Sequence, residues 1–113
     1  LELVAQANNL ELPGDRLRPE IVRTYYFTAA GNQNISGFAG MWPGRKFIVV
    51  NADGVDNITL LHQDAASTAP NRIISPTGAA YVLGPFESAI FTYLRGRDGA
   101  EVNRCLIIWG TGA

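Results

Sequence analysis

The amino-acid sequence predicts one all-β domain, an antiparallel β-sandwich that is jelly-roll-like, with an extended N-terminal arm. The chain has 113 residues, of which 47% are hydrophobic, so one core can form without metals or crosslinks. Twelve glycines and six prolines interrupt the sequence, at roughly the eight-to-twelve-residue spacing of sandwiches and barrels. Helical periodicity is weak, so we expect less than about 15% helix.

The predicted strands are the apolar and β-branched runs between these turn residues. About eight are expected, over residues 22–28, 34–38, 45–51, 57–63, 72–75, 79–83, 88–93 and 103–109. Turns are predicted at 51–54, 84–85 and 96–99, because Asn, Asp and Gly tolerate positive φ. The residues expected in the core are Phe47, Val49, Ile58, Leu60, Leu83, Phe91 and Ile107.

Residues 1–21 read as an arm or linker leading into the domain at 22–113. The first ten residues are compatible with a short helix, but Pro13 and Pro19 stop any extension. Two alternatives stay open for this arm: it lies folded back along its own domain, or it docks onto another surface. The anchors for docking would be its spaced leucines, Leu1, Leu3, Leu10, Leu12 and Leu17.

Two predicted strands are apolar on both faces, at residues 47–50 and 105–109. A strand with one face in water should alternate apolar and polar residues. These two strands therefore require a second covering layer. Either other segments of the same chain or a neighbouring subunit supplies it.

Charge and cysteine content exclude several classes of partner. Nine Lys and Arg against ten Asp and Glu give a net charge of -1, and no basic cluster of the kind that binds nucleic acid is present. No apolar stretch approaches the roughly 20 residues of a membrane helix, and no signal peptide is recognised. The single cysteine, Cys105, allows no disulfide within the chain, and its apolar strand should raise the pKa of its thiol.

A search for reactive constellations predicts no catalytic, cofactor-binding or metal-binding residues. His62 lies close in sequence to Asp64 and Ser67, too close for a catalytic triad on a strand and its adjoining loop. Zinc needs several Cys or His ligands, and one of each is present. We therefore expect a protein that is not an enzyme and needs no cofactor.

Aromatic residues offer a different kind of site. Trp42 precedes a Pro-Gly turn, and an aromatic ring exposed there would suit a glycan or a protein partner. Residues 25–27 are all aromatic, so rings point to both faces of one strand.

The stretch from Thr28 to Tyr93 resembles a β-rich module of tailed-bacteriophage structural proteins, found in tail fibres and head-associated proteins. The segments that carry the resemblance are NISGFAG (34–40), PGRKFIVVN (43–51), NITLLHQ (57–63), STAPNRI (67–73) and the region 83–93. The connection at 94–102 is longer than in the module, and the final strand is more apolar.

The resemblance implies a virion protein, a capsid decoration or cement protein that forms a homotrimer on the particle surface. Its arm and Trp42 would contact the major capsid protein or other virion proteins. The alternative that it implies is a receptor- or glycan-binding module of a tail fibre or spike, in which Trp42 would stack on a bacterial surface sugar. Neither setting involves nucleic acid or a membrane.

Overall fold

The computed structural model describes residues 1–14, 16–18, 21–94 and 103–113. Within these ranges the chain is all-β, with no α-helix and one three-residue 3-10 helix, η1 (Ala69–Asn71). The predicted low helix content is confirmed for this part of the chain. The strands there are β1 (Glu2–Leu3), β2 (Leu10–Glu11), β3 (Arg23–Ala29), β4 (Gln33–Ile35), β5 (Phe38–Ala39), β6 (Lys46–Asn51), β7 (Ile58–Leu60), β8 (Ile73–Ile74), β9 (Tyr81–Leu83), β10 (Ser88–Leu94) and β11 (Arg104–Gly110).

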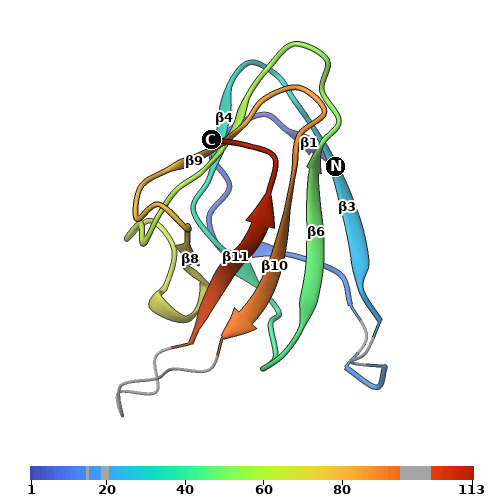
Figure 1. Cartoon of the computed structure of the whole chain (residues 1–113), viewed down its shortest axis with the longest axis vertical. Coiled ribbons are helices and arrows are strands. Elements are labelled where there is room, and N and C mark those ends of the chain that lie inside the picture. The colour runs from blue at the N-terminus through green and yellow to red at the C-terminus, as the bar shows by residue number, and fades with distance from the viewer. Residues whose placement is uncertain (15, 19–20, 95–102) are drawn as a thin grey trace.

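The strands form a six-stranded sheet in the order β1-β3-β6-β10-β11-β8, a three-stranded sheet β4-β7-β9 and the pair β2-β5. In Figure 1 the long strands β3, β6, β10 and β11 run side by side along the long axis of the molecule. The prediction of wholly antiparallel sheets is wrong, because β3 pairs in parallel with β6, β8 with β11 and β4 with β7. Each of these pairs is joined by a long connection, as parallel pairing requires, and not by a tight hairpin.

The predicted strand at 34–38 is divided into β4 and β5 at Ser36 and Gly37. A Cβ on Gly37 would clash with the carbonyl oxygen of Asn71 and lie 2.6 Å from Oγ of Ser67. The chain bends here because the loop after β7 packs directly against this backbone. Only glycine allows so close an approach.

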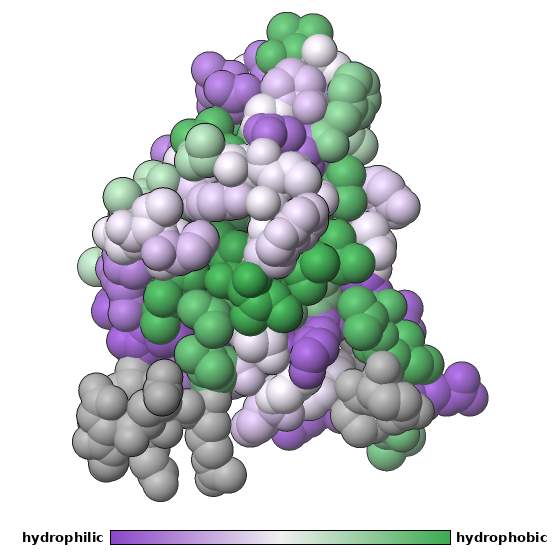
Figure 2. Space-filling model, in the orientation of Figure 1, coloured by the Kyte–Doolittle hydropathy of each residue, from purple (hydrophilic) through white to green (hydrophobic). Residues whose placement is uncertain are grey.

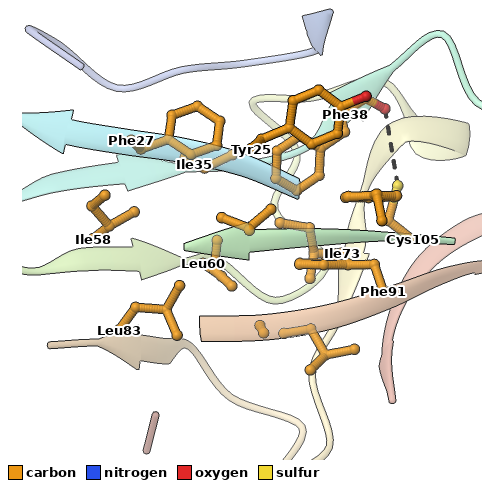
Figure 3. Close-up of a cluster of buried hydrophobic side chains, with 14 of the residues drawn as sticks. Tyr25, Phe27, Ile35, Phe38, Ile58, Leu60, Ile73, Leu83, Phe91 and Cys105 are labelled. Carbon is orange, nitrogen blue, oxygen red and sulfur yellow. Dashed lines mark hydrogen bonds between the residues drawn. The ribbon is translucent and has the colours of Figure 1, made fainter. Parts of the chain in front are cut away.

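The core is built from buried residues of both larger sheets, and alternation along the strands supplies them. In β6 and β10 every second residue is buried, and the partners come from β4, β7 and β9 (Figure 3). Phe47 and Phe91 stack with ring centroids 4.8 Å apart, and Phe38 meets both rings edge-on at 5.3 Å. All seven residues predicted to be in the core are buried.

The N-terminal arm, over residues 1–14, lies folded back along its own domain. β1 pairs with the end of β3, and β2 pairs with β5. Leu3 and Leu12 belong to the hydrophobic core, with 6% and 2% of their surfaces exposed. Residues 1–11 contain the two short strands β1 and β2 and no helix.

Candidate functional site

The outer face of the six-stranded sheet carries a group of apolar side chains that are exposed or only partly buried. Alternation in β6 and β10 turns Ile48, Val50 and Ile90 away from the core, where they are only partly buried. Leu106 on β11 has the same orientation. Figure 2 shows hydrophobic side chains gathered across the middle of this face, over the strands that Figure 1 labels β6, β10 and β11.

Strand register places these residues in continuous rows. Ile48 of β6 is paired with Ile90 of β10, and Ile90 with Trp109 of β11. On the other side, Val50 is paired with Tyr26 of β3. The result is one apolar surface that crosses four strands, which we call the outer sheet face.

A bulge in β11 increases the exposure at one edge of this face. The register shifts between Ile90 and Phe91, which are paired with Trp109 and Ile107, so Ile108 is the extra residue. Ile108 and Trp109 are 48% and 59% exposed, and Tyr26 at the opposite edge is 62% exposed. Sequence reasoning identified the apolar strands but did not single out Tyr26. Because side chains alternate along a strand, Tyr26 must point to the face opposite that of Tyr25 and Phe27.

The exposed apolar area of the outer sheet face is comparable with that of the largest patch on a typical monomer. At roughly 200 Å² per aromatic side chain, and with the aliphatic residues added, we take its exposed apolar area as roughly 500 Å², within the 300–600 Å² found for the largest patch on a typical monomer. Alternation places three charged residues of the described strands on the outer side of the sheet. Lys46 and Arg104 lie at one end, and Glu2 lies on the edge strand β1, paired with Thr28 of β3. The middle of the face is therefore suited to an apolar partner.

The leucines predicted as docking anchors fall into two groups. Leu3 and Leu12 are buried, and Leu10 packs against the core, so these three hold the arm to its own domain. Leu1 is 64% exposed and Leu17 is 93% exposed. The structure does not bring the five side chains together on one surface.

Trp42 is buried, with 8% of its surface exposed, and the prediction of an exposed ring is wrong. The Arg45 guanidinium lies 4.5 Å from the centroid of the Trp42 ring, and Arg16 covers the ring at 5.9 Å. The Pro-Gly turn does place Trp42 at a reversal of the chain, but the returning arm closes over it. The rings that are exposed instead are those of Tyr26, Phe86 and Trp109.

Arg45 fastens the arm to the domain from inside. It is 2% exposed, and its Nη1 donates to the carbonyl oxygens of Gly40 at 3.0 Å and Leu12 at 3.3 Å. Its Nη2 donates to the carbonyl oxygen of Pro13 at 2.9 Å and to the hydroxyl of Tyr25 at 2.6 Å. The Tyr25 hydroxyl in turn donates to Pro13. The buried charge is thus solvated by carbonyl groups, two of them from the arm.

A second polar cluster joins two of the segments that carry the phage resemblance. The hydroxyls of Ser36 and Ser67 lie 2.6 Å apart, and the Asn9 amide donates to Ser67 Oγ at 2.9 Å. Oδ1 of Asn9 accepts hydrogen bonds from the backbone of Thr68 and the side chain of Asn71. These motif residues therefore connect the arm to the loop at 64–72, which is a structural role.

Asn51 has the strand-ending role that its position predicts. Its Oδ1 accepts the Asp53 amide at 3.0 Å, and its Nδ2 donates to the carbonyl oxygens of Asp56, Leu83 and Gly84. Asp53 then accepts amide hydrogen bonds from Asp56, Val55 and Ala29, which lower the pKa of its carboxyl group. The loops at this end of the molecule are held together by buried and half-buried polar groups.

The residues that could form a reactive site are engaged in structural contacts. Nδ1 of His62 accepts the Ser75 amide at 3.0 Å, and Oδ1 of Asp64 accepts the Ala66 amide at 2.8 Å. Cys105 is fully buried with its thiol near the carbonyl oxygen of Phe38 (Figure 3), and burial raises the pKa of the thiol to about 12. The high pKa agrees with the prediction from sequence.

The described residues offer neither a metal site nor a membrane-spanning helix. They contain no group of three or more His, Cys, Asp and Glu side chains placed to hold a metal ion. In the same part of the chain there is no helix of the length and hydropathy needed to cross a membrane.

The comparisons with known proteins add no family to this description. The outer sheet face, built from β3, β6, β10 and β11, remains the candidate site on structural grounds. No protein-family model and no curated protein matches the chain.

Proposed function

We propose that this chain is a non-enzymatic structural protein whose copies associate through the outer sheet face. The observation that supports the proposal is the continuous apolar surface between Tyr26 and Trp109. The side chains at its two edges are largely exposed to water, Tyr26 at 62% and Trp109 at 59%. Continuous apolar patches of this size are often functional.

A second copy is the occupant that fits this surface best. Removing roughly 500 Å² of apolar surface from water is favourable by about 12 kcal/mol for each copy at 25 cal/mol per Å², and association opposes it by about 4–15 kcal/mol. In a homotrimer each copy would bury part of this face against each of its two neighbours around a three-fold axis. A glycan would find few hydrogen-bonding groups among Ile48, Val50 and Ile90, and Trp42, the ring predicted to stack on a sugar, is buried.

The setting of this assembly comes from the sequence resemblance. A module resembling those of tailed-phage structural proteins, with an apolar face for self-association, fits a capsid decoration or cement protein that forms a homotrimer on the particle. The packing of a six-stranded sheet against a three-stranded one fits a sandwich of jelly-roll type.

The self-association is tested by sedimentation equilibrium of the intact chain and three variants. Ile108→Glu and Trp109→Glu place a carboxylate on the outer sheet face, at side chains that are 48% and 59% exposed. Val4→Glu is the matched control, because Val4 is 70% exposed and belongs to none of the strands of this face.

We expect an oligomer, a trimer in the proposed setting, for the unmodified chain and for Val4→Glu. Ile108→Glu and Trp109→Glu should be monomers with unchanged circular dichroism. A monomeric unmodified chain at micromolar concentration would refute the interface. Immunogold labelling of an intact particle tests the setting: label on the capsid supports decoration, label on the tail assigns the chain to a fibre, and an unlabelled particle contradicts both.

A further inference from the structure

The outer sheet face ends in a different aromatic ring on each side. Neither of the short edge strands extends as far as these rings, because β1 is paired with residues 28–29 of β3 and β8 with residues 105–106 of β11. Tyr26 and Trp109 therefore lie on the outermost strands of their rows. In Figure 1 these strands, β3 and β11, stand on opposite sides of the four long strands.

The side formed by β3 carries hydroxyl groups. Alternation along the strand points Thr24, Tyr26 and Thr28 outward, and all three are exposed. A short threonine two residues away in each direction leaves space beside the Tyr26 ring. Each hydroxyl oxygen can accept a hydrogen bond as well as donate one. We call these three residues the tyrosine edge.

The side formed by β11 is bulkier and has no side-chain acceptor. The β-bulge places the large side chains of Ile108 and Trp109 next to each other in the sequence, and both are exposed. Ile108 is apolar, and the indole nitrogen of Trp109 is a hydrogen-bond donor only. We call these two residues the tryptophan edge.

The two edges of one molecule are too far apart to pair with each other. Three strand spacings separate β3 from β11, which is roughly 14 Å. When another molecule covers the tryptophan edge, the Trp109 indole N–H loses its water and needs an acceptor from that molecule, because a buried donor without a partner is costly. The tyrosine edge of a second copy supplies hydroxyl acceptors.

We propose that the tyrosine edge of one copy packs against the tryptophan edge of the next, with the Trp109 indole N–H donating to the Tyr26 hydroxyl. This inference rests on the proposed function, because it specifies how two copies meet on the outer sheet face. It makes the contact heterologous, and a heterologous contact can close into a ring of three. Tyrosine and tryptophan are also the residues that most often dominate the energy of an interface.

Contacts between like edges are less well matched. Two tryptophan edges would bury two indole N–H groups without a side-chain acceptor for either. They would also place two bulky edges against each other, while the space beside the threonines of the tyrosine edge stayed unfilled. Pairing of unlike edges provides the acceptor and lets large side chains occupy that space.

The indole signal of Trp109 in a ¹H–¹⁵N spectrum reports this contact directly. The labelled variant is Tyr26→Glu, which keeps only the tryptophan edge. The unlabelled titrant is Trp109→Glu, which keeps only the tyrosine edge. The indole signal of Trp42, which is buried in the domain, is the internal reference. The titration extends to roughly 1 mM, because a single contact between two copies should be weak.

Two further titrants are the matched controls. Trp109→Glu combined with Tyr26→Glu lacks both edges and should cause no shift. Trp109→Glu combined with Tyr26→Phe keeps the ring but lacks the hydroxyl, so its dissociation constant should be about fivefold higher. Dispersed spectra establish that the variants are folded. If Tyr26→Glu does not fold, Tyr26→Thr removes the ring without adding a charge and matches Thr24 and Thr28.

We expect the Trp109 indole signal to shift and saturate with the first titrant while the Trp42 signal stays in place. No shift, an equal shift with the titrant that lacks both edges, or an unchanged dissociation constant for Tyr26→Phe would overturn the proposal. A Trp109 signal that moves with the concentration of the labelled variant alone would do so too, because it indicates contact between like edges.

Sedimentation of the unmodified chain separates this failure from failure of the proposed function. An oligomeric chain whose variants show no indole shift would overturn the pairing of unlike edges and leave self-association in place. A monomeric chain would overturn the proposed function itself.

Discussion

Replacing Arg45 with Met should separate the arm from the domain and lower the free energy of unfolding. Arg45 is 2% exposed and is the donor in four hydrogen bonds, to Leu12, Pro13, Gly40 and Tyr25. Hydrogen bonds to a charged group contribute about 1.5–3 kcal/mol each. Methionine fills a similar volume but leaves buried carbonyl oxygens without donors.

The expected magnitude is smaller than the sum of these bonds. Transfer of the Arg45 guanidinium out of water costs several kcal/mol, and the substitution removes this cost. We expect a net loss of about 3 kcal/mol, a large part of the 5–15 kcal/mol that stabilises a typical domain. Arg45→Lys should recover little of it, because an ammonium group cannot reproduce the planar fork that reaches four acceptors.

Urea denaturation followed by circular dichroism measures this loss. Hydrogen exchange locates it: the amide of Leu10, which donates to the Gly37 carbonyl oxygen at 2.9 Å, should exchange faster in Arg45→Met, because the arm opens. The amide of Phe91, in the middle of β10, should keep its order of protection relative to the other core amides. An unchanged urea midpoint, or a lower midpoint without faster exchange at Leu10, would refute the role of Arg45 as the fastener of the arm.

Three further predictions follow from burial and backbone geometry. Leu12→Ala should lower the free energy of unfolding by about 2–5 kcal/mol, because Leu12 is only 2% exposed. Leu17→Ala, at a side chain that is 93% exposed, should change it by no more than about 0.5 kcal/mol. Equal denaturation midpoints for the two variants would mean that the arm does not contribute to the core. Phe86→Gly should be more stable than Phe86→Ala by about 0.5–1 kcal/mol, because glycine relieves the positive φ; the reverse order in thermal melts would show that the turn is unstrained. The free energy of unfolding should fall by about 1.4 kcal/mol per pH unit as the pH rises from about 9 toward 12. The reason is that the Cys105 thiol ionises in the unfolded chain but keeps its proton in the folded one, where its pKa is about 12. A Cys105→Ala chain with the same slope would contradict this.

Much of the β-structure could be predicted because it depends on local periodicity. In β6 and β10, residues such as Phe47 and Phe91 alternate with outward-facing residues over six or seven positions, and the alternation alone identifies strand and core. The turn at Asn51 was also predictable, since an Asn side chain can bond the backbone of its own turn. The direction of strand pairing could not be predicted, because nothing local in the sequence distinguishes a parallel partner such as β3 from an antiparallel one.

The candidate site was predictable in part. The doubly apolar runs in β6 and β11 indicated a covered outer face, but its full extent depends on the pairing of Tyr26 with Val50 and on the bulge at Ile108. The exposure of Phe86 went unnoticed, although a Gly-Pro pair followed by a bulky residue is a signal for a strained turn. Trp42 was misjudged because its burial depends on residues far from it in sequence, Arg16 and the arm.

The sequence by itself determined the strand-rich character of the chain, the residues of the core and the apolar nature of two strands on both faces. These properties follow from alternation and from glycine and proline, which act over a few residues. Tertiary structure decided where the arm lies, because Leu3, Leu12 and Arg45 could equally have met a partner. The deciding contacts join residues more than 25 positions apart; Arg45 and Leu12, for example, are separated by 33 positions. Such contacts form only when the whole chain packs around one core.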